Sequence, residues 1–306
     1  MLMPKKVSII EVGPRDGLQN EKNIIGLDDK VTYIKLLSEA GLREIEATSF
    51  VRAEKIPQMS DGIELYKKLL LEPSLKQTTL YSLVPNDVGL ENALEAGVKD
   101  IAIFTATSNT FNKKNINATI DESLKRIDLV MKKANAEGMK ARAYISTVFG
   151  CPYEGETSLV ELKKIATHLK NLGIKEISLG DTIGVANPLQ VKEVINYLSN
   201  DFSLDFFAMH FHDTKGMAVA NTLAALQMGL SRFDSSSGGL GGCPYAIGAS
   251  GNVATEDLVT LFSSMGIDCG VDMKKLAAAS SFILKKLNKT SQSKSLTAYL
   301  SQTSQN

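Results

Sequence analysis

The sequence lacks most features that mark secreted, membrane or nucleic-acid-binding proteins. It has only three cysteines, too few for a disulfide framework, which fits a reducing compartment. Acidic and basic residues balance at 34 each without a long basic block, so nothing indicates a nucleic-acid partner. No apolar run reaches the roughly 18 residues of a membrane span. The first strand begins close to Met1 and leaves no room for a signal peptide, so we expect a cytoplasmic protein.

Histidine is equally scarce, yet two of the three histidines stand one residue apart, as His210 and His212. They end a largely apolar segment that we predict to be a strand, and residues two apart in a strand project on the same side. Two imidazoles on one face suit a divalent metal ion. Two structural histidines bonded to nearby backbone explain the isolated pattern at least as well, so the rest of the chain has to decide.

One unit recurs along the chain: a short strand, a polar turn and a helix. Eight such units run from Val7 to Met265, and glycine often separates a helix from the next strand, as at Gly41 and Gly97. This alternation indicates a parallel sheet, and eight units favour an α/β fold closed into a (β/α)8 TIM barrel. The alternative is an open doubly wound sheet, but its glycine-rich fingerprint after the first strand is missing.

The predicted elements divide the chain into residues 1–265, a TIM-barrel catalytic domain, and residues 266–306, a C-terminal helical extension. In the extension we expect a helix over 273–287 and a frayed Ser/Thr/Gln-rich tail. The stretch 108–117 is predicted to be a polar loop. The predicted strands cover 7–12, 44–48, 78–84, 100–105, 140–148, 175–179, 204–212 and 232–236. The predicted helices cover 28–40, 61–71, 87–96, 120–137, 158–171, 189–198, 217–229 and 253–265.

In such a barrel, chemistry collects at the C-terminal ends of the strands. A carboxylate, two imidazoles and an amide oxygen at this rim form a mixed ligand set that leaves positions open for water or substrate. Such a set suits a bound Mg²⁺ or Mn²⁺, or else Zn²⁺ or Co²⁺, and does not resemble a closed structural zinc site. The polar side chains predicted near the rim are Arg15, Asp16, Glu46, Asp181, His210, His212, Cys243, Asn252 and Glu256.

Several of these residues also have ordinary structural explanations. Asp16 before a glycine is typical of a turn, and Asn252 before a helix is typical of a cap. Cys243 follows two glycines and precedes a proline, although most free cysteines are simply small buried residues. Glu46 is harder to dismiss, because an inward carboxylate in a strand needs a partner such as Arg15.

Seven segments of the chain, spread over residues 7 to about 265, resemble the motifs of 3-hydroxy-3-methylglutaryl-CoA lyase, a family of metal-dependent lyase/synthase barrels. The cysteine segment is specific to the lyase, whereas the His-x-His and Asp-Gly elements are shared with condensing relatives. The segments are 11–21, 46–51, 150–155, 178–184, 210–214, 238–246 and 248–257.

The resemblance implies cleavage of a CoA thioester, 3-hydroxy-3-methylglutaryl-CoA, to acetoacetate and acetyl-CoA with a divalent metal, Mg²⁺ or Mn²⁺ before others. Lys114 and Asn115 are usually just solvated in such a loop, but they are candidates for binding a CoA phosphate. A homodimer is the expected assembly. The metal-associated residues implied are Asp16, His210, His212 and Asn252.

The resemblance also assigns roles in the reaction. Arg15 would face the thioester oxygen, Glu46 would orient Arg15 and a metal-bound water, and Asp181 would act in hydroxyl proton transfer. Cys243 would close over the site as proton donor, and Glu256 would be a supporting carboxylate.

Two other functions remain open at this stage. A condensing relative, such as an isopropylmalate- or citramalate-type synthase, shares the barrel and metal set. It normally carries a longer C-terminal region than the forty or so residues present here. The second alternative is a non-catalytic barrel that binds CoA esters or a metal ion. It would not explain why the complete set of polar residues is present at the rim.

Overall fold

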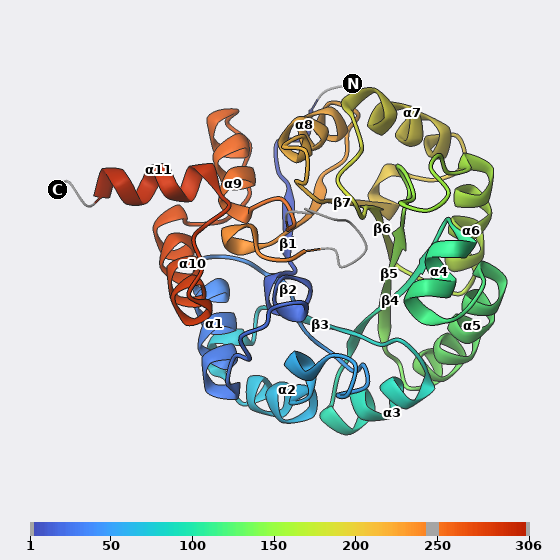
Figure 1. Cartoon of the computed structure of the whole chain (residues 1–306), viewed down its shortest axis with the longest axis horizontal. Helices are drawn as coiled ribbons and strands as arrows, with labels where there is room; N and C mark the ends of the chain where they lie inside the picture. The colour runs from blue at the N-terminus through green and yellow to red at the C-terminus, as the bar shows by residue number, and fades with distance from the viewer. Residues whose placement is uncertain (1–2, 243–250, 304–306) are drawn as a thin grey trace.

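Eight parallel strands close into a barrel with helices around it (Figure 1). This arrangement is seen in a computed structural model, which describes residues 3–242 and 251–303. Each strand pairs with its neighbour in sequence, and the last strand pairs in parallel with the first, from Ser8 opposite Arg232 to Glu11 opposite Ser235. The predicted TIM barrel is therefore confirmed.

The strands lie where alternating and apolar segments predicted them, with shifts of a few residues at their ends. They are β1 (Ser8–Glu11), β2 (Glu44–Ser49), β3 (Thr79–Leu83), β4 (Asp100–Ala106), β5 (Lys140–Ser146), β6 (Glu176–Asp181), β7 (Phe207–Phe211) and β8 (Arg232–Ser235).

Several barrel helices begin or end at recognisable signals. Thr119 and Glu122 form a reciprocal capping box at the start of α5, and Gly97 ends α3 in the left-handed conformation. The helices that follow the strands are α1 (Leu27–Glu39), α2 (Gly62–Leu70), α3 (Asp87–Ala96), α5 (Ile120–Ala136), α6 (Leu159–Asn171), α7 (Pro188–Ser199), α8 (Ala218–Gln227) and α9 (Thr255–Ser264).

The polar loop predicted after β4 is wrong, because Asn109–Ile116 form an additional helix, α4. The Ser108 side chain accepts a hydrogen bond from the Phe111 backbone N–H and caps its start. Phe111 is buried, and Asn117 ends the helix in the left-handed conformation. Capping and one aromatic anchor therefore form a helix that lacks an apolar stripe.

The extension holds two helices, α10 (Met273–Leu287), as predicted, and α11 (Lys294–Thr303). The helix α11 was not predicted and projects from the barrel in Figure 1. The fraying expected at the end of the Ser/Thr/Gln-rich tail stays a prediction, since residues 304–306 lie outside the described part. Asp257 on α9 accepts hydrogen bonds from the Ser293 hydroxyl and the Ser295 backbone N–H, and these contacts hold the start of α11. The domain boundary at residue 265 stays a prediction.

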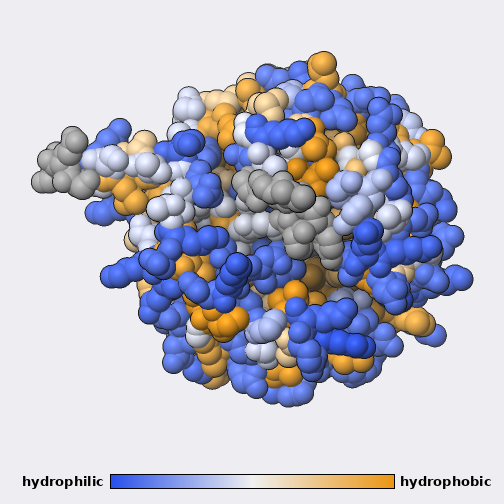
Figure 2. Space-filling view, in the orientation of Figure 1, coloured by the Kyte–Doolittle hydropathy of each residue, from blue (hydrophilic) through white to orange (hydrophobic). Residues whose placement is uncertain are grey.

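The face shown in Figure 2 is mainly hydrophilic, and the hydrophobic residues on it are scattered. The large exposed apolar side chains are spread along the described chain, and examples are Leu71 after α2, Val160 on α6 and Leu189 on α7. Among the described residues, none of the helices combines the length and apolar character that crossing a bilayer requires.

The inside of the barrel differs from the usual packing of branched apolar side chains. Arg142 on β5 reaches Asp234 on β8 with 2.8 Å between Nη2 and Oδ1, and these two strands are not neighbours in the sheet. Both residues are almost completely buried. Ion pairs and hydrogen bonds therefore cross the barrel interior, below the rim where the candidate site lies.

Candidate active site

The turn after β1 places Arg15 and Asp16 at the rim. Gly13–Gly17 form one widened helical turn, η1, in which the N–H groups of Asp16 and Gly17 both donate to Val12 O. Such π-type turns are frequent at functional sites. Close packing requires the glycines, because a Cβ on Gly13 would lie 2.4 Å from Glu11 Oε1. The sequence Gly-Pro-Arg-Asp-Gly thus presents two adjacent charged residues from a tightly packed turn.

His210, His212 and Asp16 come together at the rim. The two imidazole centroids lie 5.3 Å apart, and one potential ligand atom from each of the three residues lies within 4.8 Å of the others. Both histidines are buried, whereas Asp16 is partly exposed. The arrangement provides two nitrogens and a carboxylate oxygen in a spacing that one metal ion can bridge.

Asn252 joins this cluster from the segment before α9. Its Nδ2 donates to Asp16 Oδ2 over 2.8 Å, and its backbone forms a bridge with that of His212. Within the described part of the chain, Asn252 Oδ1 and His212 Nδ1 are buried without a hydrogen-bond partner. Buried polar atoms are rarely left without partners, so the Asn252 oxygen fits an additional group such as a metal ion.

The protonation states in this cluster also suit a cation. Burial raises the pKa of Asp16, but Arg15 and the two histidines outweigh it and lower the pKa to about 2. Burial, together with neighbouring His210, lowers the pKa of His212 to about 4. At neutral pH the cluster therefore offers a carboxylate and a neutral imidazole, which are the forms that bind metal.

Arg15 is held beside the cluster by two carboxylates. Its Nε donates to Glu46 Oε2 and its Nη1 to Asp16 Oδ1, both over 2.6 Å, while its guanidinium lies 5.4 Å from the Tyr144 ring centroid. Burial alone would lower the pKa of Arg15, but Glu46 and Asp16 raise it above its ordinary value. Burial raises the pKa of Glu46 although Arg15 opposes this. A fixed positive charge therefore faces the rim.

Asp181 lies at the end of β6 and holds the turn that follows. Its two carboxylate oxygens accept hydrogen bonds from the backbone N–H groups of Val185 and Ala186, at 2.9 and 3.0 Å. Burial raises its pKa to about 6 in spite of these bonds. Its backbone carbonyl also accepts from the His212 N–H, so Asp181 adjoins the cluster.

Glu256 is completely buried and contacts groups outside the three-residue cluster. Both of its carboxylate oxygens lie 3.0 Å from the Gly238 backbone nitrogen, and Oε1 accepts a hydrogen bond from Ser280 of α10. Burial raises its pKa to about 7. The carboxylate thus joins the segment after β8 to the C-terminal extension.

The remaining predicted residues make other contacts or lie outside the described structure. Lys114 is exposed on α4, where its Nζ lies 4.6 Å from the Tyr153 ring centroid, and Asn115 follows it on the same helix. Cys243 lies outside the described residues. Neither Lys114 nor Asn115 belongs to the three-residue cluster.

Sequence reasoning missed three buried polar residues beneath the rim. Tyr144 donates to Glu46 Oε2 over 3.0 Å, Arg142 donates to Tyr144 over 3.1 Å, and Asp234 contacts His210. The available signal was alternation, since Arg142 and Tyr144 occupy every second position of an otherwise largely apolar strand and must share one face. Charged residues on an inward strand face need partners, and the partners here are residues of the site.

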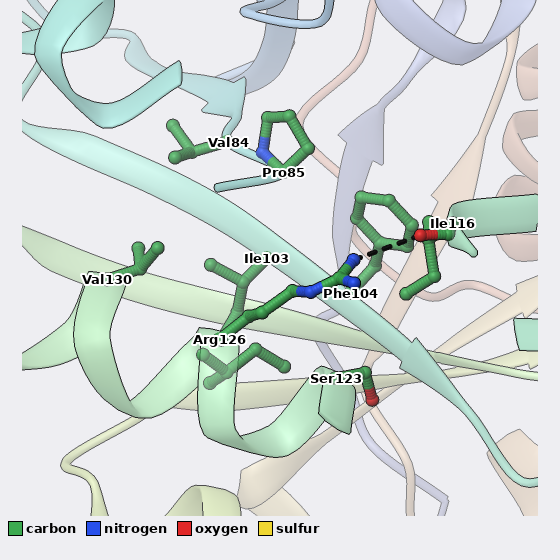
Figure 3. A pocket seen from close by; sticks show the side chains of 9 residues that line it. Val84, Pro85, Ile103, Phe104, Ile116, Ser123, Arg126 and Val130 are labelled. Atoms are coloured by element: carbon green, nitrogen blue, oxygen red, sulfur yellow. Dashed lines mark hydrogen bonds between the residues drawn. The ribbon is translucent and has the colours of Figure 1, made fainter. Parts of the chain in front are cut away.

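A separate small cavity lies between β4 and α5 and is lined mainly by apolar side chains such as Val84, Ile103 and Phe104 (Figure 3). At its edge, Arg126 donates to the carbonyl of Ile116 over 3.0 Å. No residue of the rim cluster lines it. The cavity therefore has no direct part in the candidate site.

A closed (β/α)8 barrel with this cluster at its rim defines a class, the metal-assisted barrel enzymes. Within this class the chain belongs to the HMGL-like family, whose model matches residues 6–283. This result confirms the resemblance read from the motifs.

Individual hydroxymethylglutaryl-CoA lyases also resemble the chain in sequence and in structure. The chain is 50% identical over 291 residues to the mitochondrial hydroxymethylglutaryl-CoA lyase of Bos taurus, covering 95% of this chain and 89% of the relative. The crystal structure of hydroxymethylglutaryl-CoA lyase from Pseudomonas aeruginosa matches with a TM-score of 0.95 and 43% identity, covering 99% and 100% of the two chains. An HMG-CoA lyase from A. baumannii, in complex with coenzyme A and 3-methylmalate, matches with a TM-score of 0.90 and 35% identity, covering 96% and 95%.

Proposed function

We propose that this protein cleaves 3-hydroxy-3-methylglutaryl-CoA to acetoacetate and acetyl-CoA with the help of a divalent metal ion. The observation that carries this function is the cluster of Asp16, His210 and His212 beside the buried cation Arg15, in a chain about half identical to such a lyase. The protein is a carbon–carbon lyase. The reaction is a retro-Claisen cleavage, in which a tertiary alkoxide becomes a ketone and the bond between its carbon and the methylene carbon next to the thioester breaks.

We propose Asp16, His210 and His212 as the residues that would hold the metal, with Asn252 Oδ1 as a further oxygen donor. When bound, the ion supplies Lewis acidity to the hydroxyl and carboxylate oxygens of the substrate. Mg²⁺ or Mn²⁺ is the proposed ion, because the set mixes oxygen with imidazole nitrogen and leaves positions open for substrate. The Asn252 Oδ1 atom, buried without a partner among the described residues, supports this proposal.

Asp181 is the proposed acceptor of the proton from the tertiary hydroxyl. A carboxyl group with a pKa raised to about 6 by burial is ionised at neutral pH and is a stronger base than an ordinary aspartate. The backbone N–H groups of Val185 and Ala186 fix the orientation of this carboxylate. As the proton leaves, the carbon–oxygen bond becomes a carbonyl, and the electron pair of the broken carbon–carbon bond moves to the thioester.

Arg15 is the proposed partner of the enolate oxygen that then forms. A buried, permanently charged guanidinium stabilises developing negative charge more strongly than a solvated one does. Glu46 orients Arg15 through the 2.6 Å bond from Nε to Oε2, and Glu256 acts indirectly by holding the segment at Gly238. Cys243 is the proposed acid that protonates the enolate carbon, and this role rests on the sequence around it.

The CoA part of the substrate calls for a phosphate contact outside the cluster. Lys114, exposed on α4, and the neighbouring Asn115 are our proposed contacts, since an ammonium group binds phosphate as a point charge. The relative from A. baumannii was crystallised with coenzyme A. We also propose a homodimer that works in the cytoplasm, and light scattering after gel filtration would test the dimer.

A coupled acetoacetate assay tests the function directly. We expect acetoacetate from 3-hydroxy-3-methylglutaryl-CoA, loss of activity in EDTA, and recovery when Mg²⁺ or Mn²⁺ is restored. A parallel assay supplies acetyl-CoA and a 2-oxo acid. Condensation without cleavage would identify a synthase instead, and binding without either product would identify a non-catalytic barrel.

A further inference from the structure

Asp234 contacts a candidate metal ligand from beneath the rim. Its Oδ2 lies 3.2 Å from His210 Nδ1 and accepts a hydrogen bond from the Ser178 hydroxyl over 2.6 Å. Its Oδ1 lies 2.8 Å from Arg142 Nη2. The Asp234 side chain has no exposed surface, so these donors, rather than water, surround the carboxylate.

The chemistry of these contacts determines where His210 carries its hydrogen. A carboxylate paired with a guanidinium accepts hydrogen bonds and has no hydrogen to donate. His210 Nδ1 must therefore be the donor, and in the neutral imidazole this leaves the lone pair on Nε2. We propose that Asp234 is a positioning residue that fixes the Nδ1–H tautomer of His210 and thereby presents Nε2 to the metal. This inference rests on the metal site of the proposed function.

Arg142 connects Asp234 with the residues that hold Arg15. Its Nη2 also lies 2.8 Å from Glu176 Oε1, so this one nitrogen contacts two buried carboxylates. Its Nη1 donates to the Tyr144 hydroxyl, which in turn donates to Glu46. One guanidinium thus positions both Asp234 beneath His210 and the carboxylate that orients the enolate-stabilising arginine.

His212 provides an internal contrast. Its Nδ1 is buried and has no hydrogen-bond partner within the described part of the chain. No carboxylate therefore selects its tautomer from behind, as Asp234 does for His210. The two adjacent ligands should differ in how strongly the protein fixes their ring hydrogens before any metal binds.

The first experiment measures the tautomer of His210 in metal-free protein by ¹⁵N NMR of the imidazole rings, at a pH where the rings are neutral. The chain has three histidines, and His168→Gln, which alters a partly exposed residue on α6, leaves only the two of interest. We expect His210 to carry its hydrogen on Nδ1. A hydrogen found on Nε2 would overturn the proposal without the need for any site variant.

The second experiment compares Mn²⁺ affinity in Asp234→Asn and Asp128→Asn, counting free Mn²⁺ by electron paramagnetic resonance. The asparagine amide would donate to His210 Nδ1 and shift the hydrogen to Nε2, so affinity should fall about 10–100-fold. Asp128→Asn is the matched control, because Asp128 pairs with His168 at 2.7 Å on the surface. Unchanged affinity in a folded Asp234→Asn protein would contradict the proposal.

These readouts separate this inference from the proposed reaction. If the protein lacked lyase activity but Asp234→Asn still moved the hydrogen and weakened Mn²⁺ binding, the function would fail and the positioning role would stand. If turnover were confirmed but neither readout changed, Asp234 would be only a structural ion-pair partner. Should the asparagine variant not fold, the NMR measurement on protein with Asp234 intact still decides.

Discussion

The amide of Asn252 donates to the carboxylate of Asp16 across 2.8 Å, although 236 positions separate the two residues in the chain. The bond uses the amide nitrogen and leaves the amide oxygen buried without a partner within the described structure. Because the nitrogen is engaged with Asp16, the amide cannot rotate without losing that bond. The oxygen is therefore the atom that Asn252 offers to a cation.

Asn252→Ala removes both the oxygen and the bond that orients Asp16. We expect Mn²⁺ affinity to fall about 10–100-fold, the usual cost of losing an orienting partner at a metal site. Titration calorimetry on metal-free protein measures this effect. Asn187→Ala is the control, because it removes the cap of α7, which costs about 1 kcal/mol of stability, and should leave metal binding unchanged. Equal affinities in the two variants would remove Asn252 from the metal site.

Arg15→Gln tests the cation beside the cluster. Removing a charge that meets the developing enolate typically costs about 10²–10³ in rate, so kcat should fall by this factor with little change in KM. Steady-state kinetics of acetoacetate formation separate the two constants. Arg43→Gln, just before β2 at the opposite end of the barrel, should leave both nearly unchanged. A defect confined to KM would assign Arg15 to substrate binding instead.

Cys243→Ser tests the proposed acid. A hydroxyl is a far weaker acid than a thiol, and general acid–base catalysis is worth about 10²–10⁴ in rate. We expect normal Mn²⁺ binding and a loss of turnover of about 10² or more. Alkylation should inactivate the unmodified protein, and bound product should slow that loss. Cys269→Ser, which changes a partly exposed cysteine, is the control. Full turnover in Cys243→Ser would leave this residue without a chemical role.

Glu11→Gln tests how buried acids affect stability. Glu11 accepts hydrogen bonds from the backbone N–H groups of Gly13 and Ser237 and from the Thr255 hydroxyl, and burial raises its pKa to about 7. A carboxyl with a raised folded-state pKa favours the folded state below its unfolded pKa. That contribution, about 3 kcal/mol at most, is lost as the pH rises to 7 and above.

Urea denaturation between pH 5 and 8 measures this contribution. The original protein should lose stability as the pH rises through this window, and Glu11→Gln should flatten the decline, because glutamine stays neutral and can still accept the two backbone hydrogen bonds. Glu161→Gln, a substitution at the start of α6, should keep the slope of the original protein. An identical slope in Glu11→Gln would show that Glu11 does not titrate in this range.

Sequence periodicity predicted the barrel because its outer shell follows simple rules. The strand faces toward the helices are apolar, and glycines often follow the helices. The apolar pattern alone therefore places Ile45 of β2 and Leu90 of α3 in the core between strands and helices. The helix α4 could not be placed this way, because capping by Ser108 and burial of Phe111 replace an apolar stripe. Short helices formed by such local contacts leave little periodic signal.

The rim residues could be predicted because each follows or ends a strand, and parallel strands bring these ends together. The support beneath them depends on which strands face each other across the barrel. The contact of Arg142 with Asp234 joins β5 to β8, and the sequence of neither strand predicts that these two residues meet. The predicted supporting role of Glu256 illustrates the same limit, since its contacts with Gly238 and Ser280 depend on how α10 packs.

The closure of β8 against β1 has a consequence for synthesis of the chain on the ribosome. Asp16 is translated long before its partners His210, His212 and Asn252, which emerge only after most of the barrel has been made. Until then, Asp16 lacks the imidazole and amide groups that surround it in the finished protein. A nascent chain therefore cannot assemble this metal site, and any ion must enter after translation has passed residue 252.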